Sequence, residues 1–227
     1  MFLTTDKLNP DRESDVKHFD KNLLETLPKD YLQFLQKFGD GTFCSEVYIT
    51  YPDSQTILST FKDYTDFWEF NEFYNKEDLL QSIQIGSTFD GDINCVTKNK
   101  KGQIFVLPRD SETVQSYKTF NDTIKSFVPK ISTPYFDPSF DTKSEEINLI
   151  KSSGVLLNIS SIHEKFLKSF SFDFVIDETT QPKYFFKNFG GWVNFDLFYK
   201  NGIYIKFQNQ SFEKVSPIIN FLKQLAV

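Results

Sequence analysis

Residues 27–41 read LPKDYLQFLQKFGDG, and this stretch decides the fold of the first half of the chain. Its apolar residues recur at spacings of three and four, the period of one helix face: Tyr31, Phe34, Leu35 and Phe38. Pro28 stands near the first helical position and Asp30 in the first turn, where negative charge suits the helix dipole. Gly39 predicts the end of the helix. The same spacing reaches back to residue 15, so we expect a helical run over residues 15–38, split at Pro28.

The remaining first half predicts alternating strands and helices. β-Formers between Gly41 and Pro52 predict a strand or short hairpin over 43–51, and helical spacing returns over 60–83. Ile85-Gly86 begins a further sheet region. Its expected elements are a turn at Asp90-Gly91-Asp92, a strand at 93–97, a turn at 99–102, a return strand at 103–107 and a closing helix at 120–128.

A boundary between two domains is expected near residue 130. The stretch 129–142 holds three prolines with serine, threonine and aspartate, and it shows no sustained period. We therefore expect a first domain over 1–130, a linker over 131–143 and a smaller second domain over 144–227.

The second half also mixes helices and strands. We expect a short helix at 145–151, an apolar run at 155–159, a helix at 162–170, a strand at 172–176, a hairpin of 192–199 with 203–208 around Asn201-Gly202, and an amphipathic helix at 212–225. The fold class expected for the chain is α+β, with an antiparallel sheet and flanking helices in the first domain and a smaller α+β second domain.

Composition excludes several classes of protein. Two cysteines and two histidines, without the spacing of a disulfide framework or a zinc site, predict neither metal nor cofactor. A net charge of −6 has the wrong sign for direct nucleic-acid binding. The first ten residues lack an apolar signal region, and no stretch reaches about 18 apolar residues. We therefore expect a cytoplasmic protein with no membrane partner.

Catalytic patterns are sparse, and we expect a protein that is not an enzyme. The nucleophile elbow, the phosphate-binding loop and the dinucleotide fingerprint are all missing. Asp90-Gly91-Asp92 lacks the distal glutamate of a calcium loop and is interpreted as a turn. Two alternatives stay open: Cys44 or Cys95 paired with His18 or His163, and a pocket lined by Trp192, Asp196 and Tyr199.

The segment 61–95 is the candidate binding region. It holds eight acidic residues against two lysines, a net charge of −6, with six aromatic residues interleaved between positions 64 and 74. Aromatic anchors in a negative field are typical of a surface that attracts a basic partner. The alternative is a helix with a buried phenylalanine face and a solvated acidic face. The candidate partner-binding residues are Asp63, Asp66, Trp68, Glu69, Glu72, Tyr74, Glu77 and Asp78.

The pattern Leu27-Pro28-x-x-Tyr31-x-x-Phe34-Leu35 followed by Gly39-Asp40-Gly41 resembles the opening of the SUKH superfamily. Ile85-Gly86, the turn at 90–92, a strand, Gly102 with Ile104 and a final helix ending at Phe127 follow in that family's order. The resemblance covers about residues 16–128. It groups the chain with fungal cell-wall assembly regulators and bacterial immunity proteins.

This resemblance implies a non-enzymatic immunity protein that binds and blocks a cognate protein toxin, often a nuclease. An acidic surface would suit a basic nuclease site, through steering and exclusion of its substrate. The alternative from another class is an intracellular adaptor or regulator that recruits proteins through the same domain.

Overall fold

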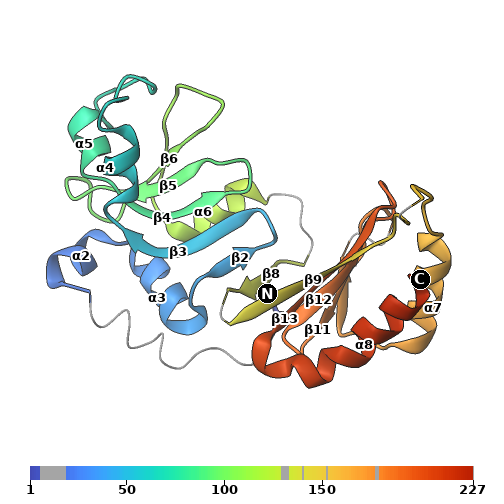
Figure 1. Cartoon of the computed structure of the whole chain (residues 1–227). Coiled ribbons are helices and arrows are strands. Elements are labelled where there is room, and N and C mark those ends of the chain that lie inside the picture. The colour runs from blue at the N-terminus through green and yellow to red at the C-terminus, as the bar shows by residue number, and fades with distance from the viewer. Residues whose placement is uncertain (6–18, 129–132, 140, 152, 177–178, 227) are drawn as a thin grey trace. The chain divides into compact units, whose positions relative to one another are not determined.

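A computed structural model of the chain describes residues 1–5, 19–128, 133–139, 141–151, 153–176 and 179–226. Residues 15–18 of the first predicted helix, His18 with them, and residues 131, 132 and 140 of the predicted linker lie outside the described residues. The chain divides into two compact units, one containing β2 to β8 and the other β9 to β13 (Figure 1). Both units combine helices with sheets, so the expected α+β class is confirmed.

Two helices open the first unit. α2 (Lys21–Thr26) begins at Asp20, whose side chain accepts a hydrogen bond from the Leu23 amide, and α3 (Lys29–Phe38) follows directly after Pro28. Gly39 ends α3 with φ of 75°, a value that favours glycine. The predicted split at Pro28 and the predicted end at Gly39 are both confirmed.

An eight-stranded sheet forms the body of this unit, in the order β1-β8-β2-β3-β4-β5-β6-β7. Its strands are β1 (Phe2–Leu3), β2 (Gly41–Phe43), β3 (Val47–Asp53), β4 (Ile83–Thr88), β5 (Ile93–Val96), β6 (Ile104–Leu107), β7 (Gln115–Tyr117) and β8 (Tyr135–Pro138). The predicted hairpins are present as β2–β3 and β5–β6, both antiparallel. The sequence pattern did not predict β7 or β8, because each is short.

Helices cover both faces of this sheet. α3 and α6 (Phe120–Phe127) lie together, with the Phe34 and Phe120 rings 5.6 Å apart. A second core cluster joins Ile57 of α4 (Thr56–Phe61) and Leu79 of α5 (Lys76–Leu80) to Phe105 and Leu107 of β6. Because β6 lies between two packed layers, all four of its residues are buried.

The predicted helix over 60–83 is wrong. α4 ends at Phe61, α5 begins at Lys76, and the residues between them are irregular. Asn71 explains part of the break, since its side-chain oxygen accepts hydrogen bonds from the amides of Phe73 and Tyr74. Asn75 begins α5 by accepting from the Asp78 amide. Asparagine side chains that bond the nearby backbone compete with the helix, and here they prevail.

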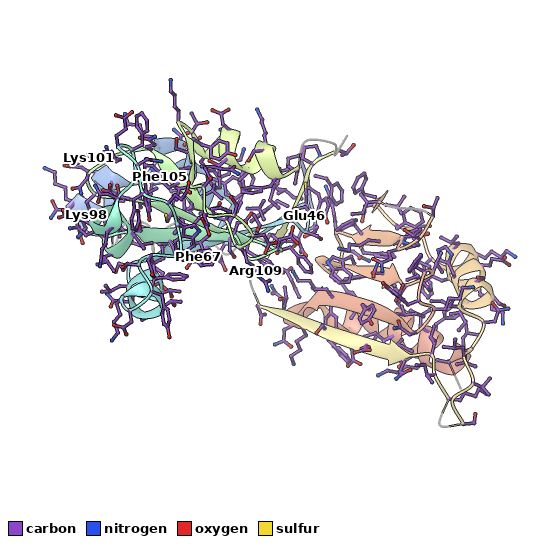
Figure 2. The ribbon with its side chains drawn as sticks, turned by 90° about the horizontal axis from the view of Figure 1, so that it is seen from above. Glu46, Phe67, Lys98, Lys101, Phe105 and Arg109 are labelled. Carbon is purple, nitrogen blue, oxygen red and sulfur yellow. The ribbon has the colours of Figure 1, made fainter. Side chains whose placement is uncertain are left out.

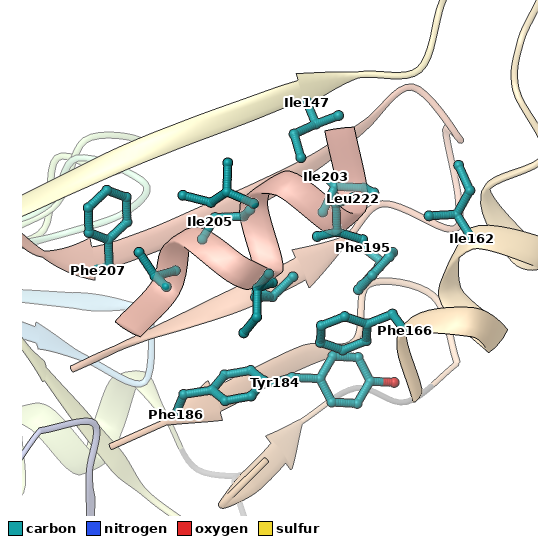
Figure 3. Packing of buried hydrophobic residues seen from close by; sticks show 14 of the residues in the cluster. Ile147, Ile162, Phe166, Tyr184, Phe186, Phe195, Ile203, Ile205, Phe207 and Leu222 are labelled. Carbon is teal, nitrogen blue, oxygen red and sulfur yellow. The ribbon is translucent and has the colours of Figure 1, made fainter. Parts of the chain in front are cut away.

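The second unit is a five-stranded antiparallel sheet covered on one face by two helices (Figure 3). Its strands, in the order β10-β11-β12-β13-β9, are β9 (Thr142–Asn148), β10 (Phe174–Ile176), β11 (Lys183–Phe186), β12 (Gly191–Phe195) and β13 (Gly202–Gln208). α7 (Ile159–Ser169) and α8 (Phe212–Leu225) supply the facing side. Phe166 and Leu222 pack there on alternate residues of β13, such as Ile203 and Ile205. α8 has the predicted bounds.

Two further predictions need correction in this region. The segment 145–151 is not a helix, because β9 pairs with β13 over seven residues from Thr142 to Asn148 and buries Ile147. Tertiary pairing has overridden a weak local pattern here. The predicted linker 131–143 also contains β8, and β9 starts inside it.

Candidate partner-binding site

The aromatic loop, residues 62–75 between α4 and α5, is held in place at three points although it has no regular structure. The Trp68 indole Nε1 donates to the Pro108 carbonyl at 2.9 Å. The Glu69 amide donates to the Glu112 carbonyl at 2.8 Å. The turn at Asn71 closes with its own amide bonded to the Tyr74 carbonyl. These bonds restrain the loop, and a restrained loop loses less conformational entropy when it binds a partner.

Three of the eight candidate residues have buried side chains, so their expected role as contacts is corrected. Trp68 is 4% exposed and Asp78 1%, and Tyr74 is fully buried. The Tyr74 hydroxyl bonds Ser82 Oγ at 3.0 Å, and burial raises the pKa of Tyr74 well above its usual value. Asp78 accepts from the Asn75 amide and from Asn99 Nδ2. These side chains support the loop from inside.

The other five candidate residues are on the surface. The carboxylates of Asp63, Asp66, Glu69, Glu72 and Glu77 all belong to exposed residues. Four aromatic residues of the aromatic loop join them: Tyr64, Phe67, Phe70 and Phe73. The loop therefore places its tryptophan inside and its phenylalanines outside, the reverse of what the sequence pattern suggested for Trp68.

An apolar pocket of about 160 Å³ opens beside the loop. Its lining residues, which define the pocket here, are Phe61, Phe67, Trp68, Gly91, Ile93, Leu107 and Arg109. Phe67 is 48% exposed, and its ring meets the Trp68 ring edge-on at 5.1 Å. Figure 2 labels Phe67 and Arg109, which line the pocket together. The pocket is of a size and polarity to receive an apolar side chain.

An acidic groove adjoins this pocket and shares Phe67 and Arg109 with it. Its other lining residues are Glu69, Asp110, Ser111, Glu112 and Thr113. The loop and residues 110–113 are joined by the backbone bond from Glu69 to Glu112 and by a parallel bridge between Glu69 and Thr113. The groove is thus lined by three acidic residues and one arginine, and its net negative charge favours a partner's cation.

Arg109 is fixed by the turn at Asp90-Gly91-Asp92. Its amide donates to Asp92 Oδ1 at 2.9 Å, and Nη1 donates to the Asp90 carbonyl at 3.3 Å. Gly91 has φ of 98°, and a Cβ there would lie 3.1 Å from Arg109 Cδ. Aspartates considered for a calcium loop instead hold one wall of the apolar pocket.

Sequence reasoning missed Arg109, Asp110 and Glu112, although a signal for them existed. The predicted hairpin pairs residues 93–97 with 103–107, and the structure has Ile93 opposite Leu107. Residues just beyond Leu107 must therefore lie next to residues just before Ile93. This register brings Arg109 to the turn at Gly91.

The residues considered for catalysis are placed as follows. Cys44 and Cys95 are buried, and burial raises the pKa of the Cys95 thiol to about 12. His163 lies in the second unit, with Nε2 2.6 Å from the Tyr184 hydroxyl. Asp196 is buried and accepts from the Tyr199 amide and Gln181 Nε2. Within the described ranges, no three histidine, cysteine, aspartate or glutamate residues gather as a metal site would require.

Comparison with protein families matches residues 12–126 to the SMI1 / KNR4 family (SUKH-1). The matched stretch makes up half of the chain and contains the aromatic loop, the apolar pocket and the acidic groove. No curated protein and no solved structure matches the chain.

Proposed function

Because the chain belongs to the SMI1 / KNR4 family (SUKH-1), which includes toxin immunity proteins, we propose that it is an immunity protein that binds a cognate protein toxin. The observation that carries the proposal is the aromatic loop beside its apolar pocket and acidic groove. An exposed aromatic anchor, a pocket and unpaired charge within one surface are the features of a protein-binding hot spot.

Apolar burial would supply most of the affinity. Phe67 already forms one wall of the apolar pocket, so a leucine, isoleucine or phenylalanine of the toxin could insert between Phe67 and Leu107. Burying such a side chain contributes about 1.5 to 3 kcal/mol. Phe70 and Phe73, both exposed on the same loop, extend the contact around this anchor.

Charge would supply steering and specificity. Glu69, Asp110 and Glu112 line the acidic groove, and Asp63, Asp66 and Glu72 are exposed on the aromatic loop. Toxins that cleave nucleic acid bind their substrate through lysine and arginine. A carboxylate surface placed over such a site attracts it at long range and excludes the polyanionic substrate. The proposed mode of action is one-to-one occlusion of a basic toxin site, for example in a nuclease.

This action needs no chemistry from the immunity protein. The SUKH family is generally one of non-catalytic immunity and regulatory domains. The residues of the proposed surface are carboxylates, aromatic rings and one arginine that is already bonded to the turn at Gly91. Blocking is therefore stoichiometric, and protection should saturate when the two proteins are present in equal amounts.

Co-expression with the product of the adjacent gene tests the proposal. We expect that product to be toxic alone, that cells survive when this chain is present, and that the two proteins purify together. If the neighbour is harmless alone, or if the two never associate, the immunity function is wrong and the adaptor interpretation takes its place.

Paired substitutions locate the surface. Phe67→Ser with Glu69→Lys changes the anchor and the acidic groove, removes the ring contact between Phe67 and Trp68, and leaves the hydrogen bond from Trp68 to the Pro108 carbonyl in place. A matched control in the second unit is Phe212→Ser with Glu164→Lys, since Phe212 is 52% exposed and Glu164 is also exposed. We expect the first pair to abolish protection and the control pair to retain it.

A further inference from the structure

The second unit carries an exposed apolar patch that the proposed toxin contact does not use. We call it the loop tip: residues 150, 151 and 153–156, between β9 and α7, and residues 197–201, between β12 and β13. Five of its side chains are exposed large apolar ones: Ile150, Val155, Leu156, Phe198 and Tyr199. Phe198 and Tyr199 meet edge-on with their ring centroids 4.8 Å apart.

Strand pairing brings the two segments of the loop tip together. Asn148 of β9 is opposite Gly202 of β13, and the Leu149 amide donates to the Asn201 carbonyl at 2.9 Å. The two segments of the loop tip therefore follow β9 and precede β13 at the same end of the sheet. Leu157 and Leu197 at the base pack against the core and anchor both segments.

The charge of the loop tip is positive. Lys151 and Lys200 are both exposed, and neither segment contains an aspartate or glutamate. Asp196, just before the second segment, is buried and accepts from the Tyr199 amide. The tip therefore combines aliphatic and aromatic side chains with two cations, opposite in sign to the aromatic loop of the first unit.

Several backbone amides of the loop tip are hydrogen-bonded locally. The Ile150 amide donates to Asn148 Oδ1, and the Lys151 and Gly154 amides donate to the carbonyls of Val155 and Lys151. In the other segment the Lys200 amide donates to the Asp196 carbonyl. Such a tip can enter a medium of low polarity without leaving these amides unpaired.

We propose that the loop tip binds the surface of an anionic membrane, with Phe198, Leu156 and their neighbours inserted among the headgroups and Lys151 and Lys200 against anionic lipids. Aromatic and aliphatic side chains beside lysine are the composition of interfacial anchors. An acidic protein surface is the competing partner. The lipid surface is favoured because the tip consists of separate side chains on two turns, which a deformable interface accommodates without a matching pocket.

In this proposal the protein binds at the membrane surface, and no part of it crosses the bilayer. Within the part of the chain that the structure describes, each helix is too short or too polar to cross a bilayer. The expectation of no membrane partner rested on the lack of such segments. It did not address a patch that two turns assemble only in the folded chain.

Vesicle sedimentation of the full chain tests the proposal. We expect co-sedimentation with vesicles of phosphatidylcholine and phosphatidylglycerol, and weaker binding to phosphatidylcholine alone. Near an anionic surface the loss of two lysines, in Lys151→Gln with Lys200→Gln, should weaken binding roughly 30-fold. Phe198→Ser with Leu156→Ser should weaken binding to both kinds of vesicle.

Matched control variants distinguish binding through the loop tip from non-specific binding of the protein to vesicles. Lys165→Gln with Lys214→Gln removes two exposed lysines elsewhere in the same unit, and Phe212→Ser with Leu167→Ser removes two exposed apolar side chains. Both control variants should bind anionic vesicles as the unaltered chain does. The proposal is overturned if the unaltered chain stays in the supernatant with anionic vesicles, or if tip and control variants bind equally.

Discussion

Trp68 is the residue on which the proposed surface most depends, although its side chain is almost entirely buried. Its indole bonds the Pro108 carbonyl, and its ring packs against Phe61 and Phe67. Trp68→Phe keeps the packing and removes the hydrogen bond, which should lower the free energy of unfolding of the first unit by about 1 kcal/mol. Trp68→Ala should lower it by about 3 to 5 kcal/mol.

Denaturant unfolding measures both Trp68 effects, and partner affinity should fall with them as the loop loosens. Trp192→Phe, in the second unit, is the control and should leave partner affinity unchanged. If Trp68→Ala weakened binding while stability stayed constant, Trp68 would be a direct contact after all and the structure's placement of its ring would be contradicted.

His163 gives the second unit a pH dependence. Burial lowers the pKa of His163 below its usual 6.5, and the ring lies against Tyr184 and Phe195. As pH falls through 6.5 the unfolded chain takes up a proton before the folded chain does, so stability decreases in that window. Above the usual pKa both states are neutral and the effect vanishes.

Thermal unfolding at pH 7.5 and at pH 5.5 is the measurement for His163. The unaltered chain should lose stability at the lower pH, and His163→Gln should lose less. An equal loss in both proteins would assign the pH dependence to carboxylates instead.

At the residue scale, the sequence predicted which residue types make up the binding region better than it predicted which side chains point outward. It identified the aromatic and acidic content of the loop, but not which of Phe67 and Trp68 points outward. That choice depends on a hydrogen-bond acceptor, the Pro108 carbonyl, which lies 40 residues further along the chain. No local pattern in the segment could reveal it.

At the scale of the element, Asn71 helps to determine the backbone conformation of the aromatic loop. Its side chain accepts from the Phe73 and Tyr74 amides, and Asn71→Ala leaves both amides without that acceptor. We expect amide hydrogen exchange at Phe73 and Tyr74 to accelerate about tenfold for each 1.4 kcal/mol lost, and partner affinity to fall. Asn121→Ala, an exposed asparagine of α6, should change neither.

Unchanged exchange at Phe73 and Tyr74 in Asn71→Ala would mean that Trp68 and the Glu69 bond hold the loop by themselves. The Asn71 side chain is also one reason why the prediction of a helix over residues 60–83 was wrong. Phenylalanines spaced three apart imitate a helix face, whereas asparagine side chains and a distant carbonyl determine the backbone.

Elements with strong local signals were predicted well. α3 and α8 were found because their apolar residues keep the helix period, and Pro28 and Gly39 also mark the two ends of α3. β9 was taken for a helix, because its one buried apolar residue, Ile147, gives no alternation to recognise. Its strand character comes from β13, which follows 54 residues later.

At the scale of the whole molecule, we propose that the two compact units are separate domains. Each has its own sheet and its own buried cluster, with Phe105 and Leu107 in one and Phe166 and Phe195 in the other. Two independent cores predict two unfolding transitions. Phe166→Ala should shift only one of them, by about 3 to 5 kcal/mol.

Differential scanning calorimetry resolves the two transitions, and Phe105→Ala provides the matched change in the first unit. A single transition that both variants shift equally would contradict the proposal of two domains. It would then be wrong to treat the toxin contact and the loop tip as independent surfaces.

We propose that the two surfaces, which carry opposite charge, bind different partners. The acidic groove and aromatic loop belong to the first unit, and the cationic loop tip belongs to the second. Sequence counting could find the acidic segment, since its charges are contiguous. It could not find the loop tip, because its two segments are brought to one end of the sheet only by the pairing of β9 with β13.

Calorimetric titration of the purified chain with the toxin of the adjacent gene tests the central claim most directly. We predict one-to-one binding that Phe67→Ser with Glu69→Lys weakens by about 30-fold or more, the loss of one hot-spot residue, while Phe212→Ser with Glu164→Lys leaves it unchanged. Equal affinity in the unaltered chain and the Phe67 and Glu69 variant would contradict the assignment of this surface to toxin binding.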